Sequence, residues 1–435
     1  MKKICKVLVC VILAIIIPVN IIGCSRHDII KDNKNTDKPV TSNDAESTDN
    51  ANNLEISGKT ADQQFISSQL NFALELFKQN VNKCRTEGNN NILVSPLSVM
   101  LALSMTANGA DGKTLKEMEK VLAATDLGGS LTIDDLNEYL YDHAKKLSSD
   151  YNAKLHIANS IWIKDQYAQN IKGDFTQKSI DYYGAEVTSS PFDASTINDI
   201  NNWVRENTDG MINKIIENTD AAAVMILVNA LCFDAEWDIP YEEKNISDGK
   251  FTNIDKSVTD VKMMHSSEHT YLEGKNCIGF KKSYNGNQYS FAALLPDENI
   301  NVYDYVNSLD HVKLAEILNN SSYKRIIATI PKFEFDYSIT LNDALISMGM
   351  EQAFSPNADF TRMSDTGLAI SNILHKTYIS VAEQGTRAGA STAVMMNGTG
   401  SAEDSVIIKL DRPFVFMIID NDTNLPIFIG CVTKF

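Results

Sequence analysis

The sequence is short of basic residues, and no cluster of them alternates with aromatic residues. It holds 39 Lys and Arg against 56 Asp and Glu, which gives a formal net charge of −17. A surface that binds nucleic acid needs a basic patch to neutralise phosphates. We therefore expect no nucleic-acid partner, and the acidity indicates only a well-solvated surface.

The common sequence signatures of a catalytic site are also missing. There is no Gly-x-Ser-x-Gly elbow, and the segment Gly112-Lys113-Thr114 lacks the first glycine and the preceding strand of a phosphate-binding loop. His265, Glu268 and His269 match the HxxEH pattern of some zinc peptidases, which need both histidines on one helix face. Their neighbours instead predict two strands joined by a polar turn. We expect no enzyme activity, no metal and no cofactor.

Cysteine pairs with CxxC spacing are absent as well. Two of the seven cysteines, Cys5 and Cys10, fall in an apolar amino-terminal run, and Cys24 follows it. The spacing of the rest fits neither a disulfide framework nor a zinc site. We expect buried free thiols at the four remaining positions, which are Cys84, Cys232, Cys277 and Cys431.

The amino terminus has the pattern of an export signal. Three lysines precede an apolar run over 7–17 that is too short for a permanent transmembrane helix. The run leads to Gly23-Cys24, which resembles a bacterial lipobox, so we expect cleavage after residue 23 and lipidation of Cys24. The alternative is an ordinary cleaved signal with an incidental cysteine. Residues 24–60, rich in Asn, Asp, Ser and Thr, are predicted to be a flexible tether, so the protein is expected outside the cell, anchored to the outer face of the membrane.

A single large domain is predicted over residues 61–435. Ile66, Leu70, Ala73 and Phe77 recur at helical spacing, and the almost wholly apolar segment 96–107 predicts a fully buried helix. Strands follow later in the chain, at 224–233 and, with one wet face, at 332–339. Apolar runs at 414–419 and 425–432 flank a turn-rich stretch and predict a hairpin. This order indicates an α+β fold.

The segment 383–393 consists mostly of small residues. Composition alone would allow a flexible linker. If the segment became a strand, however, its alternate positions would place small, uncharged side chains on one face, and Arg387 would point to the other. Such a strand would fit between existing strands without a clash. Residues 397–405, rich in Gly, Ser and Thr, predict an exposed loop that a protease could enter.

Together these residues resemble the serpin family. The resemblance covers about residues 61–435 and rests first on Glu-x-Gly-Thr at 383–386, followed by small residues. Further motifs occur in the family's order: Asn91 to Ser98, Ala158 to Trp162, Asn202 to Gly210, Val228 to Trp237, Leu295-Pro296-Asp297, Pro331-Lys332-Phe333, His375-Lys376, Asp411 to Phe414 and Leu425 to Gly430.

The resemblance implies a fold of about three β-sheets with about eight to nine helices and an exposed reactive-centre loop. It implies a monomer that inhibits serine proteases irreversibly as a suicide substrate, because the cut loop inserts into the main sheet and traps the acyl-enzyme. The residues before the candidate cut are small and the nearest downstream basic residue is Lys409, so an elastase-like or subtilisin-like partner is expected. The alternative is a non-inhibitory serpin that acts as a cell-surface binding protein.

The resemblance also assigns roles to individual residues. Forward counting from Glu383 places the reactive bond at Thr399-Gly400, and backward counting from Pro413 gives Ala402, so Ser401, Ala402 and Glu403 are alternatives. Arg387 stands where the family usually has an acidic residue. The expected hinge comprises Glu383, Gly385, Thr386, Ala388, Ala390 and Thr392. The residues expected under the opening point of the main sheet are Ser95, Ser98, Asn229 and His375, and Trp237 is the aromatic residue expected where the loop begins to enter the sheet.

Overall fold

The computed structural model describes residues 9–18, 56–88, 91–149, 153–218, 222–385 and 405–435. The predicted lipidation site at Cys24 lies outside the described residues. The same holds for part of the hinge and for the whole region of the candidate reactive bond, which comprises Thr386, Ala388, Ala390, Thr392, Thr399, Gly400, Ser401, Ala402 and Glu403.

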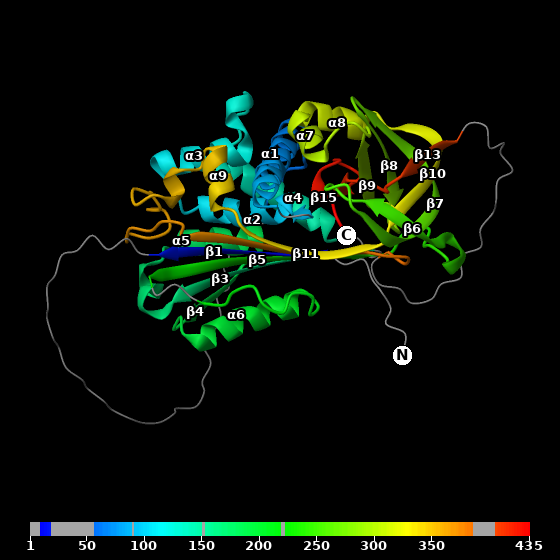
Figure 1. Ribbon diagram of the computed structural model, residues 1–435. Helices are drawn as coiled ribbons and strands as arrows, with labels where there is room; N and C mark the ends of the chain where they lie inside the picture. The colour runs from blue at the N-terminus through cyan, green and yellow to red at the C-terminus, as the bar shows by residue number, and fades with distance from the viewer. Residues whose placement is uncertain (1–8, 19–55, 89–90, 150–152, 219–221, 386–404) are drawn as a thin grey trace, which may run out of the picture.

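Most helices lie on one side of a long sheet, and α6 lies on the other (Figure 1). The described helices are α1 (Gln63–Glu87), α2 (Pro96–Ala107), α3 (Gly112–Ala123), α4 (Ile133–Leu147), α5 (Gly173–Tyr183), α6 (Ala194–Asn207), α7 (Val302–Ser308), α8 (His311–Asn319) and α9 (Asn342–Met348). In α2, the Ser95 side chain accepts a hydrogen bond from the Ser98 backbone N–H, and Pro96 starts the first turn. Every residue of α2 is buried, which confirms the buried helix predicted at 96–107.

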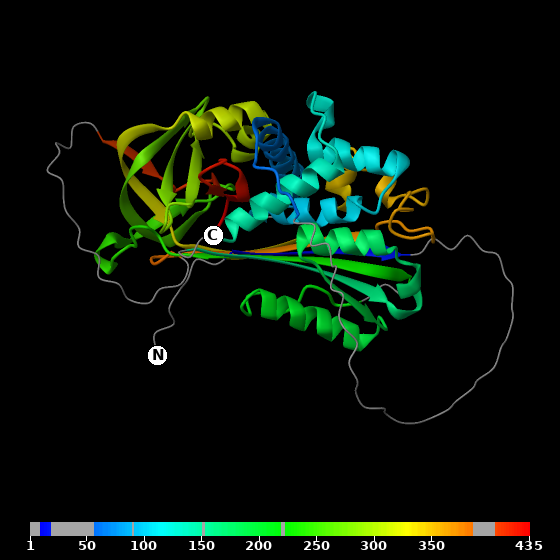
Figure 2. The same cartoon turned by 180° about the vertical axis from the view of Figure 1, so that it is seen from behind.

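The main sheet has six strands in the order β11-β12-β1-β5-β3-β4. Its members are β1 (Val9–Pro18), β3 (Ala153–Lys164), β4 (Glu186–Ser190), β5 (Ala223–Ala235), β11 (Phe333–Thr340) and β12 (Asn372–Val381). All residues of β5 are buried because α2 covers one face of the sheet and α6 the other (Figures 1 and 2). The apolar strand predicted at 224–233 is thereby confirmed.

The amino-terminal strand β1 lies inside this sheet. It pairs antiparallel with β12 from Val9, opposite Ile379, to Ile16, opposite Asn372, and it pairs antiparallel with β5 on its other edge. The apolar run that we read as part of an export signal thus forms a strand in the full-length chain. Export and cleavage of this segment remain predictions.

A second ladder, with nine strands, forms the opposite end of the molecule. Its order is β13-β10-β7-β8-β9-β14-β15-β2, with β6 also paired to β7. Its members are β2 (Ile92–Val94), β6 (Ile246–Thr252), β7 (Val258–Gly274), β8 (Cys277–Ser283), β9 (Tyr289–Pro296), β10 (Ser322–Pro331), β13 (Val406–Lys409), β14 (Phe414–Asp420) and β15 (Pro426–Val432). Strand β7 pairs with β6 over 258–264, with β10 over 263–271 and with β8 over 270–274, so it joins two groups of strands in the ladder.

This ladder also corrects one expectation. His265 and His269 do not flank a turn, since β7 runs through both without interruption. Alternation of exposed and half-buried residues along β7 explains the polar pattern that suggested a turn. The predicted carboxyl-terminal hairpin, by contrast, is confirmed by the antiparallel pairing of β14 with β15. Among the described residues, no helix has the length and apolar character needed to cross a membrane.

Candidate functional site

The chain leaves β12 through a short segment that is held to the residues after β5. The Trp237 backbone N–H donates to the Gln384 carbonyl at 3.2 Å, and its indole N–H donates to the Ala382 carbonyl at 2.9 Å. The Tyr241 backbone N–H donates to the Glu383 carbonyl at 2.8 Å. Three hydrogen bonds therefore fix residues 382–384, which include the predicted hinge residue Glu383, against residues 237–241.

Two further contacts complete this hinge. Gly385 forms an isolated bridge with Glu236 and has a φ of 87°, a left-handed conformation that favours glycine. Glu383 forms an ion pair with Lys332 at 2.7 Å, with 27% of each side chain exposed. The structure thus brings Glu383, Gly385 and Trp237 together. Lys332 and Tyr241 were not predicted, because the family resemblance assigned neither of them a role at the hinge.

Trp237 is buried between aromatic rings. The Tyr284 ring stacks on it with centroids 4.5 Å apart, and the Phe291 ring meets it edge-on at 6.0 Å. The Lys282 ammonium lies 5.4 Å from its ring centroid. The side chain of Trp237 is therefore held in place by residues of β8, of β9 and of the turn between them. Its hydrogen bonds to residues 382 and 384 in turn hold the hinge.

Four of the predicted residues, Ser95, Ser98, Asn229 and His375, belong to one hydrogen-bond network at the main sheet, away from the hinge. The Ser95 backbone N–H donates to His375 Nε2 at 3.2 Å, and the Ser95 hydroxyl donates to the Ile427 carbonyl at 2.8 Å. The Ser98 hydroxyl donates to Asn229 Oδ1. The Asn229 amide in turn donates to Asn159 Oδ1 at 2.8 Å. Asn159 also belongs to this network; it lies in the motif Ala158 to Trp162, but no site role was predicted for it.

His375 is the titratable member of the network. Burial lowers its pKa to about 3, because the charged imidazolium would lose its hydration. Since Nε2 accepts a hydrogen bond, the proton of the neutral ring is on Nδ1, which has no hydrogen-bond partner among the described residues. His375 is thus a neutral acceptor that links β12 to the start of α2.

The members of the network on β5 and β12 lie on either side of strand β1. Leu13 of β1 pairs with His375 on β12 and with Asn229 on β5. The polar network therefore lies on the two strands that border one slot in the main sheet. This slot accepts a single strand that runs antiparallel to both neighbours.

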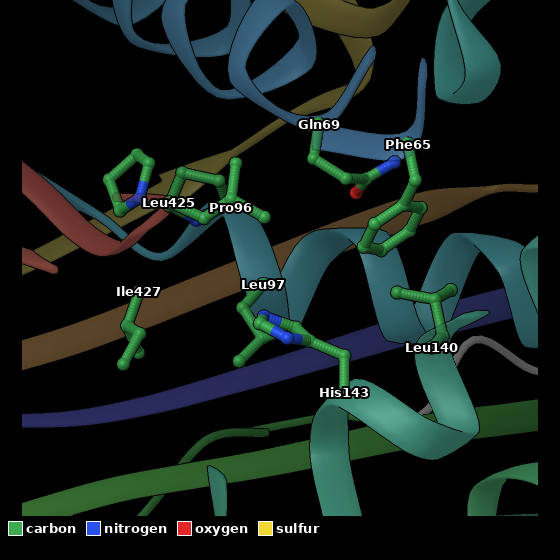
Figure 3. Close-up of a pocket in the computed structure, with 9 residues that line it drawn as sticks. Phe65, Gln69, Pro96, Leu97, Leu140, His143, Leu425 and Ile427 are labelled. Atoms are coloured by element: carbon green, nitrogen blue, oxygen red, sulfur yellow. The ribbon is translucent and has the colours of Figure 1, made fainter. Parts of the chain in front are cut away.

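The described surface also has a small cavity and a groove that could in principle hold a ligand. Figure 3 shows Phe65, Leu97, Leu140 and His143, from α1, α2 and α4, around a cavity of about 20 Å³. This volume is near that of one water molecule, so the cavity holds no larger ligand. A groove of about 480 Å³ lies between the β7–β8 turn and helices α7 and α8, and Glu273, Lys275 and Lys313 contribute to its charged lining.

Comparisons with known proteins agree with this architecture. A sequence model described as Serpin (serine protease inhibitor) matches residues 67–435. Human alpha-1-antichymotrypsin is 30% identical over 397 residues, covering 87% of this chain and 89% of that protein. The native-state crystal structure of tengpin, a thermophilic serpin, is 44% identical with a TM-score of 0.79, covering 87% of this chain and 96% of that one. Human thyroxine-binding globulin in complex with its hormone is 25% identical with a TM-score of 0.73, covering 85% and 98%.

Proposed function

Since the chain belongs to the serpin family, with the α+β serpin fold that its sequence implied, we propose that it inhibits serine proteases irreversibly by inserting its cut reactive loop into the main sheet. One observation carries the proposal: the hinge leaves β12 directly beside a slot that takes one extra strand. A segment that turned back after Gly385 would run antiparallel to β12, as β1 does.

The start of β1 marks where such an insertion would begin. Val9 pairs with Ile379, two residues before the end of β12 and close to the hinge. The alternate small residues from Thr386 onward suit a strand that must slide between β5 and β12. Thr386 is uncharged, so its early burial would leave no charge without a partner.

The proposal includes export, because β1 and the loop need the same slot. Removal of residues 1–23 would take Val9–Pro18 out of the main sheet and leave the slot free for the loop. Cys24, diacylated on its thiol, would then hold the domain at the outer face of the membrane through the tether of residues 24–60.

In the proposed reaction, the serine hydroxyl of the protease attacks the carbonyl of the residue before the scissile bond. The peptide bond breaks, the new amine leaves with its proton, and an ester joins the inhibitor to the protease. Insertion of the loop then drags the protease and distorts its oxyanion hole. Because that hole provides the main stabilisation for deacylation, the ester persists.

The residues at the candidate bond favour proteases with shallow pockets. Thr399, Gly400, Ser401 and Ala402 are all small, so an elastase-like or subtilisin-like serine protease is the proposed partner. The rival function is a cell-surface binding protein. Its support is the groove beside α7 and α8 and the likeness to thyroxine-binding globulin, whose structure holds thyroxine.

The test mixes the exported, processed protein with subtilisin and, separately, with pancreatic elastase. We expect a covalent complex that survives denaturing gels, together with a released carboxyl-terminal peptide whose mass locates the bond. Full-length chain that retains residues 1–18 is the matched control and should be cut without forming a complex. Clean cleavage of the processed protein, with the protease still active, would refute the inhibitor proposal and favour the binding protein.

A further inference from the structure

Lys282, on β8, is the only buried lysine or arginine among the residues that the structure describes, with 2% of its surface exposed. A charge so far from water persists only where partners replace its hydration. Its surroundings therefore indicate what the cation does.

The Lys282 ammonium has two hydrogen-bond partners and two ring partners. It donates to Glu268 Oε1 at 3.0 Å and to the Ile239 carbonyl at 3.1 Å. It also lies 5.4 Å from the Trp237 ring centroid and 4.7 Å from the Tyr241 ring centroid, where a cation is attracted to the aromatic face. Three of these four partners lie in one short segment, residues 237–241.

That segment is the one that holds the hinge. The backbone N–H groups of Trp237 and Tyr241 donate to Gln384 and Glu383, and the Trp237 indole donates to Ala382. No atom of Lys282 contacts the hinge through a hydrogen bond in the described residues; it acts on the residues that do. The buried Lys282 ammonium thus contacts the aromatic rings of Trp237 and Tyr241, the two residues that donate hydrogen bonds to the hinge.

We propose that Lys282 is a positioning residue for loop insertion. It holds residues 237–241 in the geometry that retains residues 382–384, and so it sets how readily the hinge opens. This role deepens the proposed inhibitory function and rests on it, but the contacts that define it do not involve a protease.

The ion pair with Glu268 offsets the free-energy cost of burying the Lys282 ammonium. Its side chain is 13% exposed, and that of Lys282 is 3% exposed. Removal of the lysine alone would leave a largely buried carboxylate without its cation, which is costly, whereas removal of both charges is often well tolerated. The double variant therefore separates the positioning role from a general loss of stability.

The experiment uses the full-length chain with Trp162→Phe and Trp203→Phe, so that Trp237 is the only fluorophore of its kind. Lys282→Met should raise amide hydrogen exchange at least tenfold at Trp237 and Tyr241, whose backbone N–H groups donate to the hinge, and shift the Trp237 emission. Lys282→Arg should restore both readouts, because the guanidinium also binds a carboxylate and stacks on rings. Lys281→Met, which removes the neighbouring lysine of β8, should change neither.

A Lys282→Met/Glu268→Met variant covers the case in which Lys282→Met fails to fold. It should fold and still show raised exchange at the Trp237 and Tyr241 amides, because no cation holds the two rings. Wild-type exchange in the double variant, or equal changes in Lys281→Met and Lys282→Met, would overturn the inference. Neither readout uses a protease, so a chain that inhibits nothing would refute the proposed function and leave this result interpretable.

Discussion

Gly385→Ala offers a direct test of how the hinge is held. A methyl group on Gly385 would lie 2.6 Å from both Cα and the carbonyl carbon of Glu236, and closer still to the Trp237 backbone nitrogen. These are backbone atoms, so no side chain can rotate to make room. The hinge must move away from residues 236–237.

The cost has three parts. An alanine at a φ of 87° costs about 1 kcal/mol in backbone strain. Separation of the strands loses the bond from Trp237 to Gln384, worth about 1 kcal/mol, and weakens the bond from Tyr241 to Glu383 by up to a similar amount. The free energy of unfolding should therefore fall by about 3 kcal/mol, which is roughly a hundredfold in the unfolding equilibrium constant.

Urea unfolding of the full-length chain, followed by circular dichroism, measures this loss. Gly88→Ala is the control for backbone strain, since Gly88 has a φ of 74° and nothing within 4 Å of its added carbon, and about 1 kcal/mol is expected. Gly367→Ala, with open space and no positive φ, should be close to neutral. If Gly385→Ala costs no more than Gly88→Ala, the close approach to residues 236–237 does not hold the hinge.

Three further predictions concern the network under the slot and the loop. Because the pKa of His375 is about 3 in the fold and about 6.5 when unfolded, the unfolded chain binds the extra proton between these values, so stability falls as the pH drops below 6.5. Between pH 7 and pH 5, this protonation should lower the free energy of unfolding by about 2 kcal/mol. His375→Gln should abolish that part of the pH dependence in urea titrations at the two pH values. An equal pH dependence in both proteins would contradict the prediction. Ser98→Ala should lower the free energy of unfolding by about 1–3 kcal/mol because Asn229 Oδ1 loses its donor, and an unchanged urea midpoint would show that the bond contributes nothing. Thr386→Arg should turn the processed protein from inhibitor into substrate on denaturing gels, whereas Arg387→Glu, on the opposite face of the inserting strand, should still form the complex.

Local sequence patterns predicted the helices, strands and hairpin that depend mainly on residues close together in the sequence. The run at 96–107 and the strand at 224–233 are apolar on all sides, and each proves to be buried on all sides. The hairpin of β14 and β15 follows from a turn between two apolar runs.

Periodicity alone could not assign the site. Asn229 and His375 lie on opposite sides of the slot only because β5 and β12 border it. The family resemblance, rather than their spacing in the sequence, indicated both residues. Lys282 is one lysine of a pair, and nothing in sequence distinguishes the buried one from its neighbour. The apolar run that forms β1 suits an export signal and a buried strand equally, since both need only consecutive apolar residues.

The four cysteines of the domain bear on where the protein can exist. Cys84, Cys232, Cys277 and Cys431 are free and buried, as the sequence predicted. Burial raises the pKa of the Cys84 thiol to about 11 and that of Cys431 well above its ordinary value, so almost no reactive thiolate forms at neutral pH. The described fold therefore closes no disulfide, and the thiols of Cys84 and Cys431 react poorly with an oxidant. Since the described residues contain no disulfide, a reducing agent alone should not lower the free energy of unfolding.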